Sequence, residues 1–160
     1  MTLARTRTRV GVWGVFGRGN FGNEATLTAF LSRLEPEVYS PVLFCEDPEA
    51  ASALHGGVPA RRLGAPVTAA PRSRLMRSLT VAGNRLRLVG GAIRAAGSVD
   101  AVVIAGTGGL ERYGSGAFGT PFEIWAIGLG CRLRRRPFVL LDVGVETLPR
   151  PVARFFVPGA

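Results

Sequence analysis

The fold of this chain is decided near its start by Val10-Gly-Val-Trp-Gly-Val-Phe16, an apolar run that leads directly into Gly17-Arg-Gly-Asn-Phe-Gly22. A short apolar run that ends in a glycine-rich turn is typical of a buried β-strand. The apolar residues that follow recur at helical spacing until Pro36 ends the pattern: Leu27, Phe30, Leu31 and Leu34. The sequence therefore predicts a strand, a glycine-rich loop and a helix in succession.

The same alternation continues along the chain. Further buried strands are predicted at residues 42–45, 101–105 and 138–142, and further helices at residues 48–54, 72–96 and 122–129. Between them, glycine and proline breaks at 56–71 favour a loop with one short strand. Strands separated by helical stretches indicate a mostly parallel sheet with helices on both faces. We expect one Rossmann-like α/β domain over residues 1–160.

The helix predicted at residues 72–96 carries two different stripes. Its arginines lie off an apolar stripe that repeats in steps of four and three: Leu75, Leu79, Ala82, Leu86, Val89 and Ile93. The favoured interpretation is that this stripe packs on the sheet. The alternative is that the arginines rest on anionic lipid, a possible membrane surface for a chain that contains no apolar run long enough to span a bilayer.

Composition limits the partners without choosing one. The chain has a net charge of +9, and because it contains no lysine all 20 basic residues are arginines. A basic balance favours anionic partners such as phosphosugars or anionic lipid. No nucleic acid is expected, because few aromatic residues are interleaved with the arginines and no binding motif is found. The two cysteines, Cys45 and Cys131, lie in apolar runs without metal-ligand spacing; we predict buried free thiols, a reducing cytoplasmic compartment and no metal site.

The glycine-rich loop has two opposed interpretations. It is a literal G-x-G-x-x-G between a strand and a helix, and Glu46 ends the next strand, about where an NAD(P)- or FAD-binding fold places its ribose-binding carboxylate. Against a dinucleotide, the helix opens with Asn23 and Glu24, and a carboxylate there repels a diphosphate. A purely structural interpretation makes Asn23 the N-cap of the helix, with Glu24 supporting the helix dipole.

Three segments give a more specific resemblance. The stretch from Gly14 to Leu27, with Gly-Asn-Phe-Gly-Asn-Glu-Ala, is similar to the N-terminal signature of the polysaccharide pyruvyl transferase family. Asp100-Ala-Val-Val-Ile-Ala-Gly-Thr-Gly-Gly-Leu110 resembles that family's strand and glycine triplet, although Thr107 replaces one glycine. Residues 138–149 resemble a later strand and turn, although Val145-Glu-Thr147 departs from the expected glycines. The segments span residues 10–149 in the family's order.

The resemblance implies a function. The fold would be the N-terminal domain of a two-domain glycosyltransferase-like (B-type) enzyme, and the reaction would transfer pyruvyl from the donor phosphoenolpyruvate to a sugar or lipid-linked saccharide acceptor of a cell-surface polysaccharide. No cofactor is implied. The family's catalytic histidine and its donor-binding arginines belong to a C-terminal half that the 160 residues do not include. The ending at 151–160 looks truncated, so we expect this chain to be inactive and poorly stable without the missing half or another chain.

The candidate residues follow from the two glycine-rich loops. Directional donors and acceptors for a sugar are supplied there. The predicted substrate-binding residues are Gly17, Gly19, Asn20, Gly22, Asn23, Glu24, Gly106, Thr107, Gly108 and Gly109. No catalytic residue is assigned; Glu24 is a weak candidate for proton transfer, ahead of Glu111, Glu123 and Glu146. The only histidine, His55, is predicted to stand outside the site.

Overall fold

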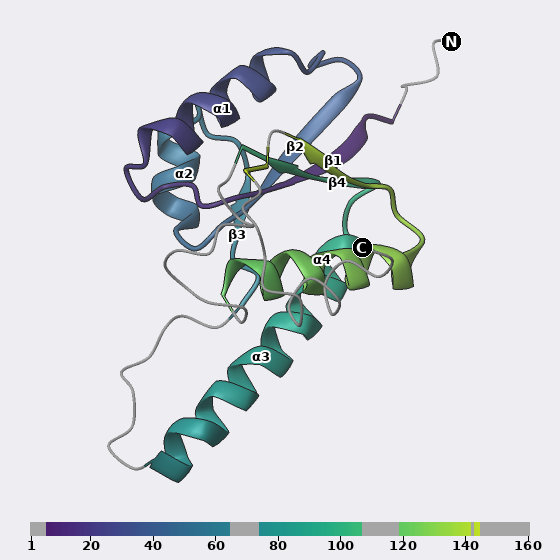
Figure 1. Cartoon of the computed structure of the whole chain (residues 1–160). Helices are drawn as coiled ribbons and strands as arrows, with labels where there is room; N and C mark the ends of the chain where they lie inside the picture. Colours follow the sequence, from purple (N-terminus) through teal and green to yellow (C-terminus); the bar gives the residue numbers. More distant parts are fainter. Residues whose placement is uncertain (1–5, 65–73, 107–118, 142, 145–160) are drawn as a thin grey trace.

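The computed structural model describes residues 6–64, 74–106, 119–141 and 143–144, with only the backbone described at 74–78. Strands and helices alternate along the chain as predicted (Figure 1). Their order is β1 (Thr8–Trp13), α1 (Phe21–Ser32), β2 (Tyr39–Phe44), α2 (Pro48–Leu54), β3 (Ala60–Arg61), α3 (Arg74–Gly97), β4 (Ala101–Ala105), α4 (Thr120–Arg134) and β5 (Phe138–Leu141).

The strands form a parallel sheet in the order β3-β2-β1-β4-β5. β1 is central and pairs with both β2 and β4, with Trp13 opposite Phe44 on one side and Ile104 on the other. The chain builds outward from β1 in one direction and then returns to build outward in the other. This order is that of a Rossmann-like, doubly wound α/β fold, which confirms the predicted fold class.

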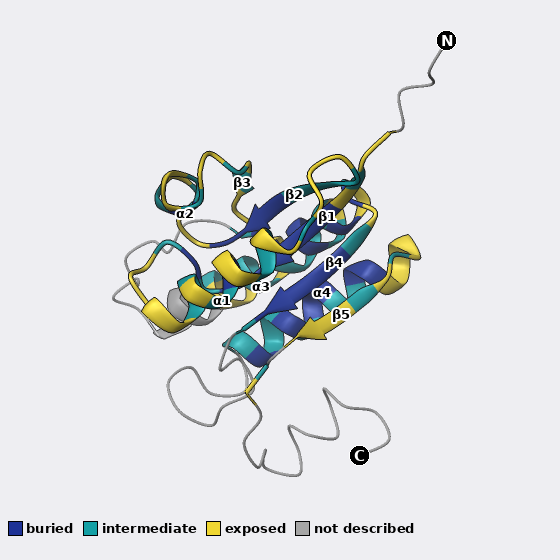
Figure 2. Ribbon diagram, turned by 90° about the horizontal axis from the view of Figure 1, so that it is seen from above, coloured by how far each residue is buried: buried dark blue, intermediate teal, exposed yellow. Residues whose placement is uncertain are grey.

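Helices cover both faces of the sheet. One face buries Val12, Leu43 and Val103 beneath α1 and α2, through Leu27 and Ala51. The other face buries a second cluster beneath α3 and α4: Trp13, Val42, Phe44, Val102, Ile104, Ala92, Ala96, Ile124 and Ile127. Figure 2 shows the buried residues running along β2, β1 and β4 between these layers. The near-continuous apolar runs of the central strands follow from burial on both faces.

Several predicted boundaries need correction. β1 ends at Trp13 instead of Phe16, because Gly14 and Val15 already form a bend. Phe16 is nevertheless fully buried, packed in the cluster beneath α1 and α2. α1 stops at Ser32, before the predicted Leu34, and α4 extends from Thr120 to Arg134 where 122–129 was predicted. The predicted element at 151–157 lies outside the described residues.

Two expectations of burial are wrong. β5 was predicted to be a buried strand, yet Val139, Leu140 and Leu141 are exposed because β5 pairs only with β4 among the described strands. The apolar stripe of α3 was predicted to pack on the sheet, yet Leu79 and Leu86 are exposed. Of that stripe, Val89 does pack against the core, together with Leu88, Ala92 and Ala96 in the second half of the helix. Figure 1 shows the reason: the first half of α3 extends beyond the sheet.

Candidate functional site

The fold places its ligand crevice at the carboxyl ends of β1 and β4. In a doubly wound sheet this crevice opens where the strand order reverses, which here is between these two neighbours. Because β1 and β4 are parallel, the glycine-rich loop after β1 and the glycine segment after β4 leave the same edge, as predicted. Gly106, with φ of 52°, lies against Thr26 of α1. Thr107, Gly108 and Gly109 lie outside the described residues.

The loop after β1 has a conformation that requires its first two glycines. Gly17 and Gly19 have φ of 79° and 73°, in the left-handed region that side chains disfavour. At Gly17 a Cβ would also meet the backbone, 2.8 Å from the carbonyl oxygen of Asp47. The third glycine is different, because a Cβ on Gly22 would meet only the Asn20 side chain at 3.5 Å. Gly22 therefore does not serve close packing of the helix on the strand, which is the role of the third glycine in a dinucleotide fold.

The N-terminus of α1 is capped by Asn20. Its Oδ1 accepts hydrogen bonds from the backbone N–H groups of Gly22 and Asn23, at 3.2 and 3.4 Å. The expectation that Asn23 is the N-cap is therefore wrong by three positions. Asn23 instead donates from Nδ2 to the carbonyl oxygen of Val15, 3.2 Å away, which ties the first turn of the helix back to the loop.

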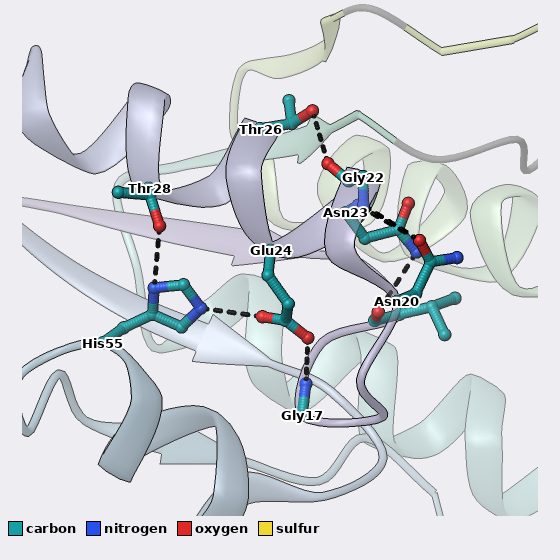
Figure 3. Close-up of polar contacts among 9 residues, drawn as sticks. Gly17, Asn20, Gly22, Asn23, Glu24, Thr26, Thr28 and His55 are labelled. Atoms are coloured by element: carbon teal, nitrogen blue, oxygen red, sulfur yellow. Dashed lines mark hydrogen bonds and ion pairs between the residues drawn. The ribbon is translucent and has the colours of Figure 1, made fainter.

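Glu24 joins the loop to α2 (Figure 3). Its Oε1 accepts a hydrogen bond from the Gly17 N–H at 2.8 Å, and its Oε2 lies 2.8 Å from Nε2 of His55. The side chains of Glu24 and His55 are only 16% and 4% exposed. Since a carboxylate only accepts, His55 donates from Nε2, and its Nδ1 lies 3.5 Å from the Thr28 hydroxyl. His55, predicted to stand outside the site, is thus held against one of its candidate residues.

These contacts occupy three backbone donors that a phosphate could otherwise use. Helix N-termini and glycine-rich loops attract anions through free backbone N–H groups. Here the donors of Gly22 and Asn23 are taken by Asn20, and that of Gly17 by Glu24, which also adds a negative charge. The predicted residues Asn20, Asn23 and Glu24 do lie together. Their side chains hydrogen-bond to the backbone and hold the glycine-rich loop against the start of α1.

A separate cavity opens beside this loop, on the α3 and α4 side of the sheet. Its volume is about 690 Å³, and its wall comes from the ends of β1 and β2, from α3 and from the start of α4. Glu24 and His55 do not line it. The polar and aromatic side chains of its wall are Trp13, Arg18, Glu46, Asp47, Arg62, Asn84, Arg85, Thr120, Phe122 and Glu123.

Several charged side chains of the cavity wall have identified partners. Arg18 forms an ion pair with Glu46 at 2.7 Å, and Asp47 caps α2 by accepting from the Ala50 N–H. Arg85 lies over the Phe122 ring, 5.0 Å from its centroid. Burial, and then the negative charge of Glu46, raise the pKa of Glu123 from 4.5 to about 7 against the opposing charge of Arg18. At neutral pH the wall therefore offers arginines, a carboxyl able to hold or release a proton, and two aromatic faces.

The sequence did not single out most of this wall. Trp13, Arg62 and the adjacent pair Asn84 and Arg85 come from three separate segments, and of the wall residues only Glu46 and Glu123 had been named as candidates. The one signal that could have found these wall residues was their position, because each of them lies at or faces the carboxyl end of a strand. The candidates Glu111 and Glu146 lie outside the described residues.

The described part of the chain contains neither a reactive cysteine nor a metal-ligand cluster. Cys45 and Cys131 are buried free thiols, as predicted. Burial raises the pKa of both to about 11, with further contributions at Cys45 from Asp47 and Glu24, so neither is a thiolate nucleophile at neutral pH. Across the described ranges, no three metal-binding side chains gather into a ligand set.

Replacing Glu123 by glutamine is expected to stabilise the fold at high pH and not at low pH. The pKa of Glu123 in the folded protein, about 7, is higher than its ordinary value of 4.5, so ionised Glu123 destabilises the folded state. This loss of stability is absent below pH 4.5, grows as the pH rises from 4.5 to 7, and is complete above pH 7. The full shift corresponds to roughly 3 kcal/mol, and solvent screening at this partly buried position reduces the expected gain to about 1–2 kcal/mol. Urea unfolding at pH 4.5 and pH 8 measures it. The exposed Glu37→Gln is the matched control, and an equal gain at both pH values would contradict the assignment.

No helix in the described part of the chain combines the length and hydropathy that crossing a bilayer requires. Comparison of the chain with protein-family models, with curated proteins and with solved structures gave no significant match.

Proposed function

We propose that this chain provides the saccharide-binding half of a polysaccharide pyruvyl transferase. In this function the cavity beside the β1 loop holds the acceptor sugar, and phosphoenolpyruvate supplies the pyruvyl group. The proposal rests on the signature-like residues from Gly14 to Leu27 together with the way these residues are used. We place the reaction on the cytoplasmic face of a membrane that carries the lipid-linked acceptor, and the two free thiols suit that reducing compartment.

The observation that carries the proposal is the closure of the glycine-rich loop by Asn20 and Glu24. Each of these two side chains satisfies backbone donors that a dinucleotide would need for its diphosphate. A family whose signature contains Asn and Glu at these positions has a physical use for them as loop-forming residues. We assign Glu24 a positioning role, because both of its carboxylate oxygens are engaged and it does not line the cavity.

The chemistry of the cavity suits a sugar. Trp13 and Phe122 offer aromatic surface, and Asn84 and Arg62 offer directional hydrogen bonds to hydroxyl groups. Forming a ketal from phosphoenolpyruvate makes two C–O bonds to the acceptor and breaks the bond to phosphate. Of the two hydroxyl protons, one ends on the former methylene carbon and the other on the departing phosphate. Glu123, with its pKa near 7, is suited to receive the first hydroxyl proton.

The alternative is an NAD(P)- or FAD-binding domain. It is favoured by the strand order and by the literal spacing of Gly17, Gly19 and Gly22. It is opposed by the occupied donors described above and by the loose surroundings of Gly22. The two functions place different ligands at the same edge of the sheet, so a direct binding measurement separates them.

Tryptophan fluorescence is the expected readout. Trp13 lines the cavity, and the ring of Trp125 lies 5.5 Å from that of Phe122, which also lines it. We expect saturable quenching by pyranosides that have two neighbouring free hydroxyl groups, and no energy transfer from tryptophan to NADH. Arg62→Ala and Glu123→Gln are expected to weaken saccharide binding about tenfold, the loss of roughly one charge-assisted hydrogen bond.

The control variants are Glu37→Gln and Glu49→Gln, two exposed carboxyl groups outside the cavity wall, which are expected to leave saccharide binding unchanged. Saturable NADH or FAD binding would replace the proposal with the dinucleotide alternative. Saccharide binding that is equally strong in Arg62→Ala and wild type would place the acceptor outside this cavity.

A further inference from the structure

The outward face of α3 has a stripe of glycines and exposed leucines. Since an α-helix turns about 100° per residue, Leu79, Gly83, Leu86 and Gly90 fall within an arc of about 60°. Leu79 and Leu86 are 60% and 75% exposed. A Cβ at Gly83 would meet no atom within 4 Å, so the surface is open there. We call these four residues the outer stripe of α3.

The core-facing side of the same helix is elsewhere. Leu88, Val89, Ala92 and Ala96 pack in the core, on an arc of the helix that does not overlap the outer stripe. Val81, Asn84, Arg85 and Leu88 line the cavity. The outer stripe therefore takes no part in the core packing of the described residues. The first half of α3 extends beyond the sheet (Figure 1).

The positive charge of α3 indicates what kind of partner binds to this stripe. From Arg74 to Gly97 the helix contains five arginines and no acidic residue: Arg74, Arg77, Arg85, Arg87 and Arg94. Arg87 and Arg94 are exposed and lie along one border of the outer stripe. Exposed leucines bordered by arginines are what a helix needs to lie in a membrane interface, with its apolar side chains inserted and its cations among lipid headgroups.

A second copy of the chain fits this surface less well. Pairing two outer stripes would bring the arginines of two helices together, and neither helix has a carboxylate to compensate them. An anionic surface instead attracts each arginine. From this charge complementarity and the exposed leucines, we propose that the outer stripe of α3 docks the protein on anionic lipid bilayers. The docking does not depend on the proposed function, although it would bring the neighbouring cavity close to the headgroups of the membrane.

Vesicle co-sedimentation tests the docking with the full chain and without any saccharide. We expect the protein to pellet with phosphatidylcholine vesicles that contain phosphatidylglycerol and to stay in solution with phosphatidylcholine alone. Binding should weaken strongly as the salt concentration rises above ~0.1 M, because the Debye length falls below about 10 Å. Replacing two arginines, Arg87→Gln with Arg94→Gln, should weaken binding about thirtyfold, since each contributes about a factor of five near an anionic surface.

The apolar part of the stripe has its own matched control. Leu79→Ser with Leu86→Ser should weaken binding at least tenfold. Leu133→Ser with Arg132→Gln removes one leucine and one arginine from α4, where Leu133 is 60% exposed, and should leave binding unchanged. Circular-dichroism melting confirms that the variants, all at exposed positions, remain folded.

Three outcomes would overturn the docking. Equal pelleting with neutral and anionic vesicles would remove the role of the arginines. If the α3 variant and the α4 control lost vesicle binding equally, the binding would depend on overall charge and hydropathy and not on the outer stripe. A dimer in light scattering that disappears in the Leu79→Ser, Leu86→Ser variant, without vesicle binding by the wild type, would assign the stripe to a second copy.

Discussion

Replacing Gly91 by alanine is expected to lower the free energy of unfolding by about 3 kcal/mol, near the upper end of overpacking effects. A Cβ at this position would lie only 1.7 Å from the carbonyl oxygen of Leu63. The obstacle is backbone, so α3 must shift away from the segment that follows β3. That shift would also disturb the close approach of α3 to α4, where a Cβ on Gly130 would lie 2.8 Å from the carbonyl oxygen of Ala92.

The matched control for this prediction is Gly83→Ala in the same helix. No atom lies within 4 Å of the position of its Cβ, so only helix propensity changes, and alanine should stabilise the helix by up to about 1 kcal/mol. For a domain of this size the two variants should therefore melt on opposite sides of the wild type, with Gly91→Ala lower by roughly 6–12 °C. Thermal melting followed by circular dichroism measures both. A Gly91→Ala protein as stable as Gly83→Ala would contradict the contact between α3 and Leu63.

Replacing Glu24 by alanine is expected to cost about 3 kcal/mol of stability. The substitution leaves the Gly17 N–H and the nearly buried Nε2 of His55 without their shared acceptor, and each unsatisfied group costs about 1–3 kcal/mol. One contact holds the glycine-rich loop and the other reaches the end of α2, so the loop and α2 should loosen together. Urea unfolding gives the free energy, and hydrogen exchange at the Gly17 amide should become faster.

Glutamine at the same position should restore part of the loss. Its amide oxygen can accept from Gly17, and its NH₂ group can donate to His55 once the imidazole changes tautomer and donates from Nδ1 to Thr28. Glu49→Ala is the matched control, because Glu49 also lies in the first turn of a helix but is exposed; its effect should stay within about 0.5 kcal/mol. If Glu24→Ala cost no more than this control, the carboxylate would have no structural role in the loop.

The sequence determined the order and type of the elements, because hydrophobic periodicity and glycine or proline breaks are local signals. Apolar runs marked β1, β2 and β4, Pro48 marked the start of α2, and the left-handed glycines marked the loop before α1. Such signals indicate the type of element that a stretch of sequence forms. From alternating strands and helices, the parallel sheet with two helical layers followed directly.

Boundaries and caps were less determined. Asn20 and Asn23 are both good N-cap residues, and the choice between them depends on where Glu24 and the Val15 carbonyl lie in three dimensions. The apolar run of β5 was predicted to be buried, but a run of apolar residues does not reveal whether its strand lies in the middle or at the edge of a sheet. Only the strand order places β5 at the edge of the described sheet and leaves Val139 and Leu140 exposed.

The candidate site was decided by tertiary structure. Glu24 and His55 are separated by 31 positions, and Arg62, Arg85 and Glu123 come from three different parts of the chain, so no local pattern links them. The raised pKa of Glu123 depends on burial and on Glu46, neither of which its neighbours in sequence reveal. The sequence alone specified the glycine-rich loop at the carboxyl edge of the sheet, with Asn20, Asn23 and Glu24. The packing of α3 and α4 specified which residues share the cavity, because side chains far apart in the chain meet only when the layers are assembled.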